Sequence, residues 1–482
     1  MTIPTTRRHF LRGVTAASIA LPWLLNRDGL FAEEATPAKP DFDTVYDLKA
    51  KAPPLKARAT AMIDLFMFGG PSQMDLFDPK PLLNQRDGEK FPGKLDADNQ
   101  AGASGIVFGS PWKFAKHGQC GMDVSELLPH TAAIVDDLCH VRGMQFGTNS
   151  HDRGAYLSNS AHPTPGRPTL GSWLTYGLGS VSQSLPAYVA LTAKGGLPFL
   201  NEQNWSAGFL PSLFQGTMVR NAVPRILNLD PPLHLAGASQ TSQLALLDQL
   251  NRQHLSQHPS ETDLQARIAS YALAARMQDS AKEAFDLSSE PAHILELYGI
   301  NDPATEGYGQ QCLIARRLVE RGVRFVSVML DGNGDVNWDN HGSLKSALET
   351  SCKRTDKPAA ALVKDLKQRG LLSTTLVRWG GEMGRLPTAE ATGDRAAWGR
   401  DHNGKAGCMW LAGAGTKAGL IHGQTDEWGH EAVSGKVSAQ DFHATVLHLF
   451  GIDHQKLVFK HNGQPHGMID GQPARVCTEL FS

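Results

Sequence analysis

The stretch AMIDLFMFGGPS, Ala61 to Ser72, combines a short apolar run with an abrupt Gly-Gly-Pro ending. A run of this kind, bounded by a turn signal, is typical of a strand buried on both faces of a parallel sheet. Similar apolar runs recur along the chain at residues 138–144, 187–191, 323–330, 374–379 and 409–412. The sequence therefore predicts one central sheet whose strands are mostly parallel.

Helical patterns lie between these apolar runs. They cover residues 124–137, 170–177, 244–255, 264–284, 309–321, 343–368 and 441–450. The clearest junction is a helix that ends at Arg321, a capping Gly322, and an apolar run that begins at Val323. Strands that alternate with helices predict an α/β fold with helices on both faces of the sheet. The range from about 200 to 301 is mainly helical and polar, and we expect it to form an insertion at one edge.

The N-terminal segment has the features of an export signal. Arg7 and Arg8 precede an uncharged apolar run, Val14–Leu25, which is too short to be a comfortable membrane span of roughly 20 residues. The paired arginines resemble a twin-arginine signal, although an amphipathic helix is the alternative and the signal could stay as an anchor. We therefore expect a periplasmic or secreted protein. The chain is divided into a signal (1–32), a linker rich in Pro, Ala and Lys (33–58), and a folded body (59–482).

Composition narrows the classes of partner. The 482 residues include 46 basic and 48 acidic side chains, so the formal charge is only −2, and no basic cluster for a nucleic acid is visible. The six cysteines lack the CxxC spacing of zinc or redox motifs. They leave two possibilities open, namely one or two disulfides or isolated buried thiols.

Acidic side chains and histidines follow several of the predicted strands. Ligands bind at the carboxyl ends of strands in an open parallel sheet, so these positions are where chemistry is expected. The candidates are Asp75, His151, Asp339, His341, Glu382, Asp401 and His402. Carboxylates and imidazoles are the ligands of a hydrolytic Zn, Mn, Mg or Ca site. The alternative is that these residues cap turns and helices, and His422 and His443 are further candidates for a ligand.

The motifs resemble those of one known family. FGGPSQMDLFDPKP, NWDNHG, WGGEMGR, GRDHNG and DFHATVLHLFGIDH are similar to motifs of the sulfatase-like family called domain of unknown function 1501. The resemblance implies the α/β fold of the alkaline phosphatase and sulfatase superfamily, with a metal-centred site above the sheet.

The same resemblance implies roles for individual residues. Asp401 and His402 stand where sulfatases and phosphatases carry adjacent metal ligands. Asp339 and His341 stand where a second Asp and His pair is expected, and Asp75 stands near the ligand after the first strand. The expected metal ligands are therefore Asp75, His151, Asp339, His341, Asp401 and His402, with His151 closing the site.

The nucleophile position differs from that of sulfatases. Sulfatases begin the corresponding helix with a Cys or Ser that is converted to formylglycine, whereas Asn149 stands at that position here. Asparagine cannot become the aldehyde, so formylglycine chemistry is not expected. Ser150 could attack directly, or a water activated by the metal could attack, with Arg153 countering oxyanion charge.

The sequence thus predicts an exported, metal-dependent hydrolase of sulfate or phosphate esters. Its substrate is expected to be a sulfated or phosphorylated small molecule or glycan, including polysaccharide fragments. The alternative is a non-catalytic member of the same fold that binds a glycan or a cell-envelope partner, which the altered nucleophile position favours.

Overall fold

The computed structural model describes residues 46–96, 104–194, 196–232, 238–258, 261–330, 337–390 and 393–482. The predicted signal (1–32) lies outside these residues, and the predicted linker (33–58) lies only partly within them. Among the described residues, no helix has both the length and the apolar character that a membrane span requires. All six cysteines are described, and all of them are free thiols.

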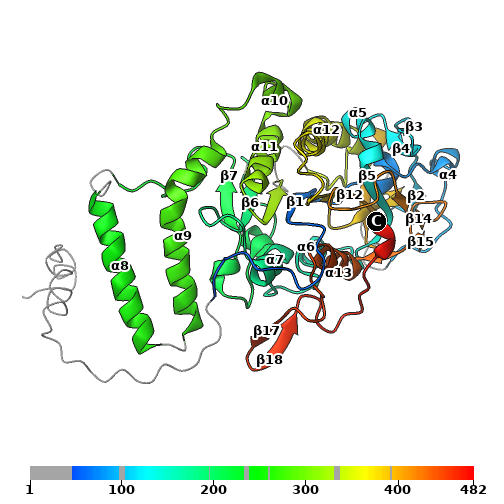
Figure 1. Ribbon diagram of the computed structural model, residues 1–482. Coiled ribbons are helices and arrows are strands. Elements are labelled where there is room, and N and C mark those ends of the chain that lie inside the picture. The colour runs from blue at the N-terminus through cyan, green and yellow to red at the C-terminus, as the bar shows by residue number, and fades with distance from the viewer. Residues whose placement is uncertain are drawn as a thin grey trace, which may run out of the picture.

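A large sheet forms the centre of the molecule (Figure 1). In the described residues its strands run in the order β13 (Ile421–His422), β5 (Leu138–Gln145), β12 (Gly407–Ala412), β9 (Thr375–Gly380), β1 (Ala61–Phe66), β8 (Phe325–Met329), β6 (Tyr188–Thr192) and β7 (Thr217–Arg220), with β16 (Val437–Ser438) also paired to β5. Every neighbouring pair is parallel except the two that involve β12. The predicted, mostly parallel sheet is therefore confirmed, and β12 is its antiparallel member.

Strand β1 lies in the middle of this sheet because its side chains are buried on both faces. Ile63 and Leu65 pack into the core on one face, whereas Met62 packs into the core on the other. Asp64 is also buried, and it pairs with Arg378 of the neighbouring strand β9 at 2.9 Å. The apolar run therefore forms a fully covered central strand, as the sequence predicts.

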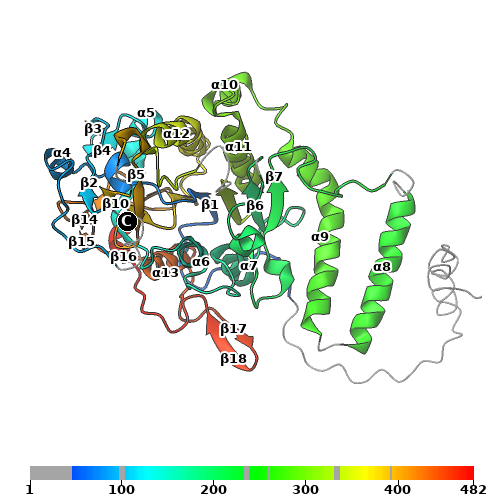
Figure 2. The ribbon, with the colours of Figure 1, turned by 180° about the vertical axis from the view of Figure 1, so that it is seen from behind.

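Helices cover both faces of the sheet. One core includes side chains from α5 (Pro129–Ala132), α11 (Glu306–Glu320) and α12 (Leu344–Gln368), and the other includes side chains from α6 (His151–Ser160), α7 (Leu170–Leu178) and α13 (Ala439–Leu449). Figures 1 and 2 show these two groups on opposite sides of β1. The predicted helices on both faces are therefore confirmed.

Two ranges differ from the expected pattern. Residues 124–137 do not form one helix, because β4 (Met122–Ser125), the short α5 and a 3-10 turn (Val135–Asp137) share that range. Within the range 200–301, β7 joins the edge of the central sheet. The helical part consists of α8 (Ala238–Gln257), α9 (Thr262–Phe285) and α10 (Ala292–Leu297). Helix α9 packs against the body, with Leu273 and Met277 in the core, and α8 lies on its outer side (Figure 1).

A small antiparallel sheet stands beside the central one and carries part of the site. It pairs β10 (Gly384–Ala389) with β11 (Arg400–Asn403) and with β2 (Ile106–Val107). The motif GRDHNG is therefore mainly a strand and not the loop that its glycines suggest. One reason for the glycines is close packing, since a Cβ atom at Gly404 would lie 2.4 Å from the Thr148 carbonyl oxygen.

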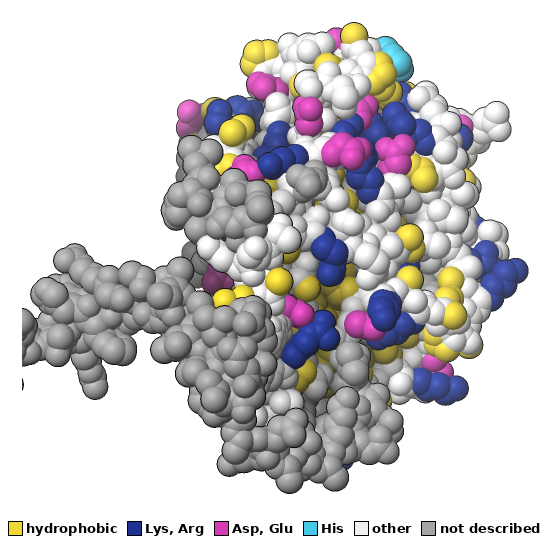
Figure 3. All heavy atoms as spheres, turned by 60° about the vertical axis from the view of Figure 1, so that its left-hand side comes forward, with side chains coloured by type: hydrophobic (Ala, Val, Ile, Leu, Met, Phe, Trp, Pro, Cys, Tyr) yellow, Lys and Arg dark blue, Asp and Glu magenta, His cyan; other side chains and the backbone are white. Residues whose placement is uncertain are grey.

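Charged side chains of both signs are mixed on the surface. On the face shown in Figure 3, Lys and Arg side chains alternate with Asp and Glu side chains. This mixture agrees with the near balance of 46 basic and 48 acidic residues in the sequence.

Candidate metal centre

Four side chains from distant parts of the chain meet beyond the carboxyl ends of the central strands. His151 begins α6, Asp339 and His341 lie between β8 and α12, and His402 belongs to β11. Ligand atoms of these four residues all lie within 4.8 Å of one another. The sequence named all four as metal ligands, and the structure brings them together.

The contacts inside this group, called the His-Asp cluster from here on, are short. The Nε2 atoms of His341 and His402 are 2.9 Å apart. The Asp339 Oδ1 atom lies 2.8 Å from His341 Nε2 and 3.2 Å from His402 Nε2, and Asp339 Oδ2 lies 3.1 Å from His151 Nε2. Three imidazole nitrogens of the same type therefore face one carboxylate.

The other ring nitrogen of each histidine is held by a hydrogen-bond acceptor. The acceptors are the Glu382 carboxylate for His151 (2.8 Å), the Glu390 carboxylate for His341, and the Asn149 carbonyl oxygen for His402 (2.7 Å). A ring nitrogen can only donate to such an oxygen, so each Nδ1 atom carries the proton. Each neutral ring then presents the lone pair of Nε2 to the cluster.

Three nitrogen lone pairs and a carboxylate that face one another repel unless a positive charge lies between them. The geometry fits a metal cation, because donors bound tetrahedrally to zinc at 2.0–2.1 Å are roughly 3.3 Å apart. Hydrogen bonds from Nδ1 to carboxylates or carbonyls are also the usual support of metal-bound histidine. The residues present therefore fit a divalent cation, and three nitrogens with one oxygen suit Zn or a similar transition metal better than Ca or Mg.

The electrostatics of the His-Asp cluster reflect the same need for positive charge. Burial alone would lower the pKa of His151, but the Asp339 and Glu382 carboxylates raise it to about 9. The hydrogen bond to Asp339 also raises the pKa of His341, whereas burial lowers that of His402. Burial opposes ionisation of Asp339, yet the three imidazoles hold the pKa of its carboxyl far below the usual range. Without a metal, protons therefore supply the charge.

Arg385, on β10, holds together the segments that deliver the ligands. Its guanidinium donates to the carbonyl oxygens of Gly69, Gly70 (3.0 Å) and Arg400 (2.9 Å), and to Asp339 Oδ1 (2.6 Å). Gly69 is required here because its φ is +112° and a Cβ atom would lie 2.3 Å from the Asp339 backbone nitrogen. The Gly-Gly turn after β1 therefore lets the backbone of Asp339 approach closely and supports the cluster directly.

Asp401 lies in a second, smaller group. Ligand atoms of His341, Glu390 and Asp401 also lie within 4.8 Å of one another, and one Asp401 oxygen accepts a hydrogen bond from the His402 backbone at 2.7 Å. His341 belongs to both groups. The adjacent residues Asp401 and His402 thus fall in two neighbouring groups that share His341.

Asp75 lies outside both groups of possible ligands. Its side chain is fully buried and pairs with the equally buried Arg400, with Nε to Oδ2 at 2.7 Å and Nη2 to Oδ1 at 3.1 Å. Ser72 also donates to Asp75 Oδ2 at 2.5 Å. The position after β1 suggested a ligand, but both carboxylate oxygens point to these partners, and the structure does not bring Asp75 to the cluster.

His443 and His422 are likewise placed elsewhere. His443 is fully buried on α13, and its Nε2 atom contacts the Leu157 carbonyl oxygen at 2.9 Å. His422 Nε2 lies 3.7 Å from a Glu479 carboxylate oxygen. Neither histidine joins the groups of possible ligands found among the described residues.

The two residues predicted to be catalytic flank His151. Ser150 is exposed at the start of α6, and its hydroxyl donates to the Asp152 carboxylate. Arg153 is exposed one turn further along. Asn149, at the position of the sulfatase formylglycine, accepts from the Gly404 backbone with its side-chain oxygen at 2.6 Å, so this side chain helps to hold β11.

The cluster is open to solvent on one side and bordered by aromatic rings on another. The His341 side chain is 36% exposed. The Phe68 ring lies 5.2 Å from the His151 ring, and Phe199, itself 42% exposed, lies 5.5 Å from Phe68 and 6.4 Å from His151. A ligand can therefore reach the cluster along an apolar wall.

Glu382 and Glu390 complete the centre, and the sequence did not place them among the ligands. Glu382 follows β9, and the pattern of an acid after a strand marks it as a candidate in the sequence, although not as one of the six expected ligands. It is fully buried and also accepts from the Gly69 backbone nitrogen at 2.8 Å. Glu390 directly follows β10 in a run without that signal.

We expect Glu382→Gln to weaken metal binding by about 10- to 100-fold, because the amide no longer anchors the protonated Nδ1 of His151 with a charge. Competition with a metal-binding dye would measure the change. Glu349→Gln, at an exposed position of α12, is the matched control and should bind metal as the parent does. Equal affinities for the two variants would contradict the role given to Glu382.

The fold and the site define an α/β protein with a candidate metal centre at the carboxyl edge of its sheet. The chain belongs to the family described as protein of unknown function DUF1501, whose model matches residues 59–481. The resemblance seen in the motifs is thereby confirmed. No curated protein matches the chain.

Several solved structures are similar. The lipoteichoic acid synthase LtaP from Listeria monocytogenes has 9% sequence identity and a TM-score of 0.36, and the match covers 85% of this chain and 76% of that chain. A variant of the alkaline phosphatase from the Antarctic bacterium TAB5 with Mg bound has 10% identity and a TM-score of 0.32, with 76% of this chain and 94% of that chain covered. The PsFucS1 sulfatase from Pseudoalteromonas sp. has 10% identity and a TM-score of 0.29, with 82% of this chain and 68% of that chain covered.

Proposed function

We propose that this protein is an exported, metal-dependent hydrolase of sulfate or phosphate esters. The observation that carries the proposal is the His-Asp cluster, in which three Nε2 lone pairs and the Asp339 carboxylate converge while every Nδ1 atom is held by an acceptor. This arrangement is costly to leave without a cation and fits one closely. Export is proposed from the sequence, because the paired Arg7 and Arg8 precede an apolar run.

A bound divalent cation supplies a Lewis acid that polarises an ester oxygen and lowers the pKa of an attacking group. His151, Asp339, His341 and His402 would hold it. Glu382 and Glu390 keep two of these imidazoles in the required tautomer. Arg153, exposed on α6 beside His151, is the proposed counterion for the oxyanion of the ester.

The residues near His151 favour a mechanism without formylglycine. Asn149 stands at the position of the modified residue, and its side chain is bonded to Gly404. We propose Ser150 or water as the nucleophile. The Ser150 hydroxyl already donates to Asp152, a carboxylate that could accept its proton.

Metal content and turnover test this function. The protein purified from its natural compartment should hold roughly one equivalent of tightly bound transition metal, measured by plasma mass spectrometry, with a second equivalent if the group of His341, Glu390 and Asp401 also binds. Aryl sulfate and aryl phosphate would then be offered to the metal-loaded protein. Turnover of either ester that ceases after chelation supports the hydrolase and assigns its class.

A second function is favoured by the altered nucleophile position. A member of this fold with Asn149 in place of the modified residue could use the metal centre only to bind a sulfated or phosphorylated glycan or an envelope partner. Such a binder would retain metal and bind the ester, but would leave aryl sulfate and aryl phosphate intact. Metal-dependent turnover would rule it out.

Metal affinity should fall as the pH is lowered. His151 has a pKa of about 9 in the metal-free protein, so below that pH the cation must displace a proton. The proton on His151 alone should lower the apparent affinity by about tenfold for each pH unit between pH 8 and pH 6, and the raised pKa of His341 makes the fall steeper toward pH 6. Titrations with a competing chelator of known pH dependence would measure this slope. An affinity that stays constant over this range would contradict the assignment of His151 as a ligand.

A further inference from the structure

A second cavity opens at the same edge of the central sheet. It has a volume of about 490 Å³ and lies beyond the carboxyl ends of three neighbouring strands, β6, β7 and β8. Lys194 follows β6, Asn221 and Arg225 follow β7, and Leu330 follows β8. This volume is in the range of small-molecule sites, and its position is where parallel sheets bind ligands.

Most of the charged side chains in the described lining of this cavity are cationic. They are Lys194, Arg225 and Arg354, and Glu306 is the one acidic residue among the lining residues. The Glu306 carboxylate accepts a hydrogen bond from Gln310 at 3.2 Å. Among the described lining residues, Lys194 and Arg225 thus outnumber the one carboxylate, which favours an anionic ligand.

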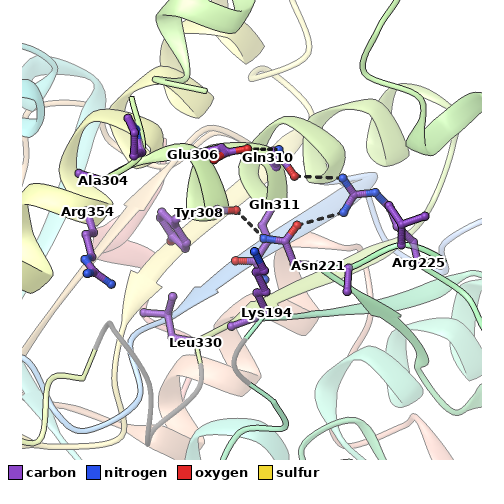
Figure 4. Close-up of a pocket in the computed structure, with 15 residues that line it drawn as sticks. Lys194, Asn221, Arg225, Ala304, Glu306, Tyr308, Gln310, Gln311, Leu330 and Arg354 are labelled. Atoms are coloured by element: carbon purple, nitrogen blue, oxygen red, sulfur yellow. Dashed lines mark hydrogen bonds between the residues drawn. The ribbon is translucent and has the colours of Figure 1, made fainter. Parts of the chain in front are cut away.

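Arg225 is positioned by neutral groups. Its guanidinium donates to the Asn221 side-chain oxygen at 3.0 Å and to the Gln310 side-chain oxygen at 3.1 Å (Figure 4). Asn221 in turn donates to the Gly307 carbonyl oxygen at 2.9 Å. Burial lowers the pKa of Arg225, as expected for a cation whose charge these neutral acceptors do not offset. Figure 4 shows this chain on one side of the cavity and Arg354 on the other.

Further donors come from the start of helix α11. Its first residues, Glu306 to Tyr308, line the cavity, so the positive end of a 15-residue helix faces the space. Gln311, 3% exposed, also lines it, and its Nε2 atom has no hydrogen-bond partner among the residues that the structure describes. A buried donor without a partner is costly, and an acceptor on a ligand would satisfy it.

We propose that this cavity binds a second anionic group of the substrate, a sulfate or phosphate ester on a neighbouring sugar unit, so that the substrate is a polyanionic oligosaccharide. The proposal rests on the proposed function for the reaction at the His-Asp cluster. A tetrahedral oxyanion accepts hydrogen bonds from several directions at once. The ammonium, guanidinium and amide groups that line this cavity are donors of the kind that such an anion requires.

The chain links this cavity to the metal centre. Lys194 lines the cavity, and Phe199, five residues later, stands beside Phe68 and His151. Five residues of extended chain span at most about 18 Å, so Lys194 lies no farther than that from Phe199, a separation that a short oligosaccharide can cover. The exposed Phe199 ring, which stands beside the His-Asp cluster, offers an apolar surface on which a sugar face can rest.

Calorimetric binding of two probes to the metal-loaded protein tests the proposal. The probes are a disaccharide with one sulfate on each sugar and the same disaccharide with a single sulfate. The parent should bind the disulfated probe about tenfold or more tightly, because the second sulfate gains charge-assisted hydrogen bonds. Lys194→Gln and Arg225→Gln should each remove most of this advantage while leaving the affinity for the monosulfated probe unchanged.

The design separates failure of this proposal from failure of the proposed function. Lys353→Gln, exposed on α12 beside Arg354, is the matched control and should retain the advantage. Lys194 is exposed, so its substitution should not disturb folding. Equal binding of both probes by the parent, or an advantage that survives Lys194→Gln and Arg225→Gln, would overturn the cavity assignment even if the esters are hydrolysed. Loss of the tighter binding of the disulfated probe in these two variants would support the cavity assignment even if no ester is hydrolysed.

Discussion

Asp339→Asn should abolish tight metal binding and, with it, any hydrolysis of aryl sulfate or phosphate. The Asp339 carboxylate lies within 3.2 Å of all three imidazole Nε2 atoms and supplies the negative charge that a divalent cation needs. An amide offers an oxygen without that charge. We expect the metal affinity to fall by more than about 100-fold, beyond the 10- to 100-fold loss typical of residues that only support a ligand. Dye competition and plasma mass spectrometry would measure it.

The matched control for this variant is Asp248→Asn. Asp248 lies on α8 in an exposed ion pair with Arg252, and such pairs contribute little to stability. This variant should bind metal and turn over substrate as the parent does. Asp339→Asn protein that is folded and retains a full equivalent of metal would show that the His-Asp cluster is not the centre.

Asp75→Asn should destabilise the fold by about 3–5 kcal/mol while leaving the metal content of the folded protein unchanged. Asp75 and Arg400 are both fully buried, and removing one charge leaves the other without compensation in the interior. Arg400 also lies against the Phe108 ring, 4.7 Å from its centre, where little water can replace the lost carboxylate. Chemical denaturation would give the free energy of unfolding.

The double variant Asp75→Leu with Arg400→Met provides the control. Because it removes both charges, it should recover much of the lost stability, as replacing buried ion pairs by apolar side chains often does. If Asp75→Asn instead unfolds like the parent but loses its metal, Asp75 is a ligand and the ion pair is incidental.

The central fold could be predicted because apolar runs and helical periodicity report burial directly. β1, β5, β6, β8, β9 and β12 all arise from runs visible in the sequence. The reversed direction of β12 could not be predicted, since a central strand is equally apolar whichever way it runs. The helix expected at 124–137 failed because Pro129 begins only a short α5, and β4 occupies the residues before it.

The members of the His-Asp cluster could be predicted because acids and histidines after parallel strands tend to share one edge. His151, Asp339, His341 and His402 were all named and do meet. The same rule also selected Asp75, because the rule uses the position of a residue after a strand and contains no information on the direction of its side chain. Glu390 and Arg385 carried no signal, because their roles depend on how β10 packs against segments far away in the chain.

The four donors of the His-Asp cluster are dispersed from His151 to His402, and β12, β13 and β16 follow the last of them. A growing polypeptide therefore has no complete coordination sphere until nearly all of it has left the ribosome. If the cluster binds a cation as proposed, loading would be a late event in biogenesis. The ion pool of the compartment where the last strands join the sheet would then decide which element the mature protein carries.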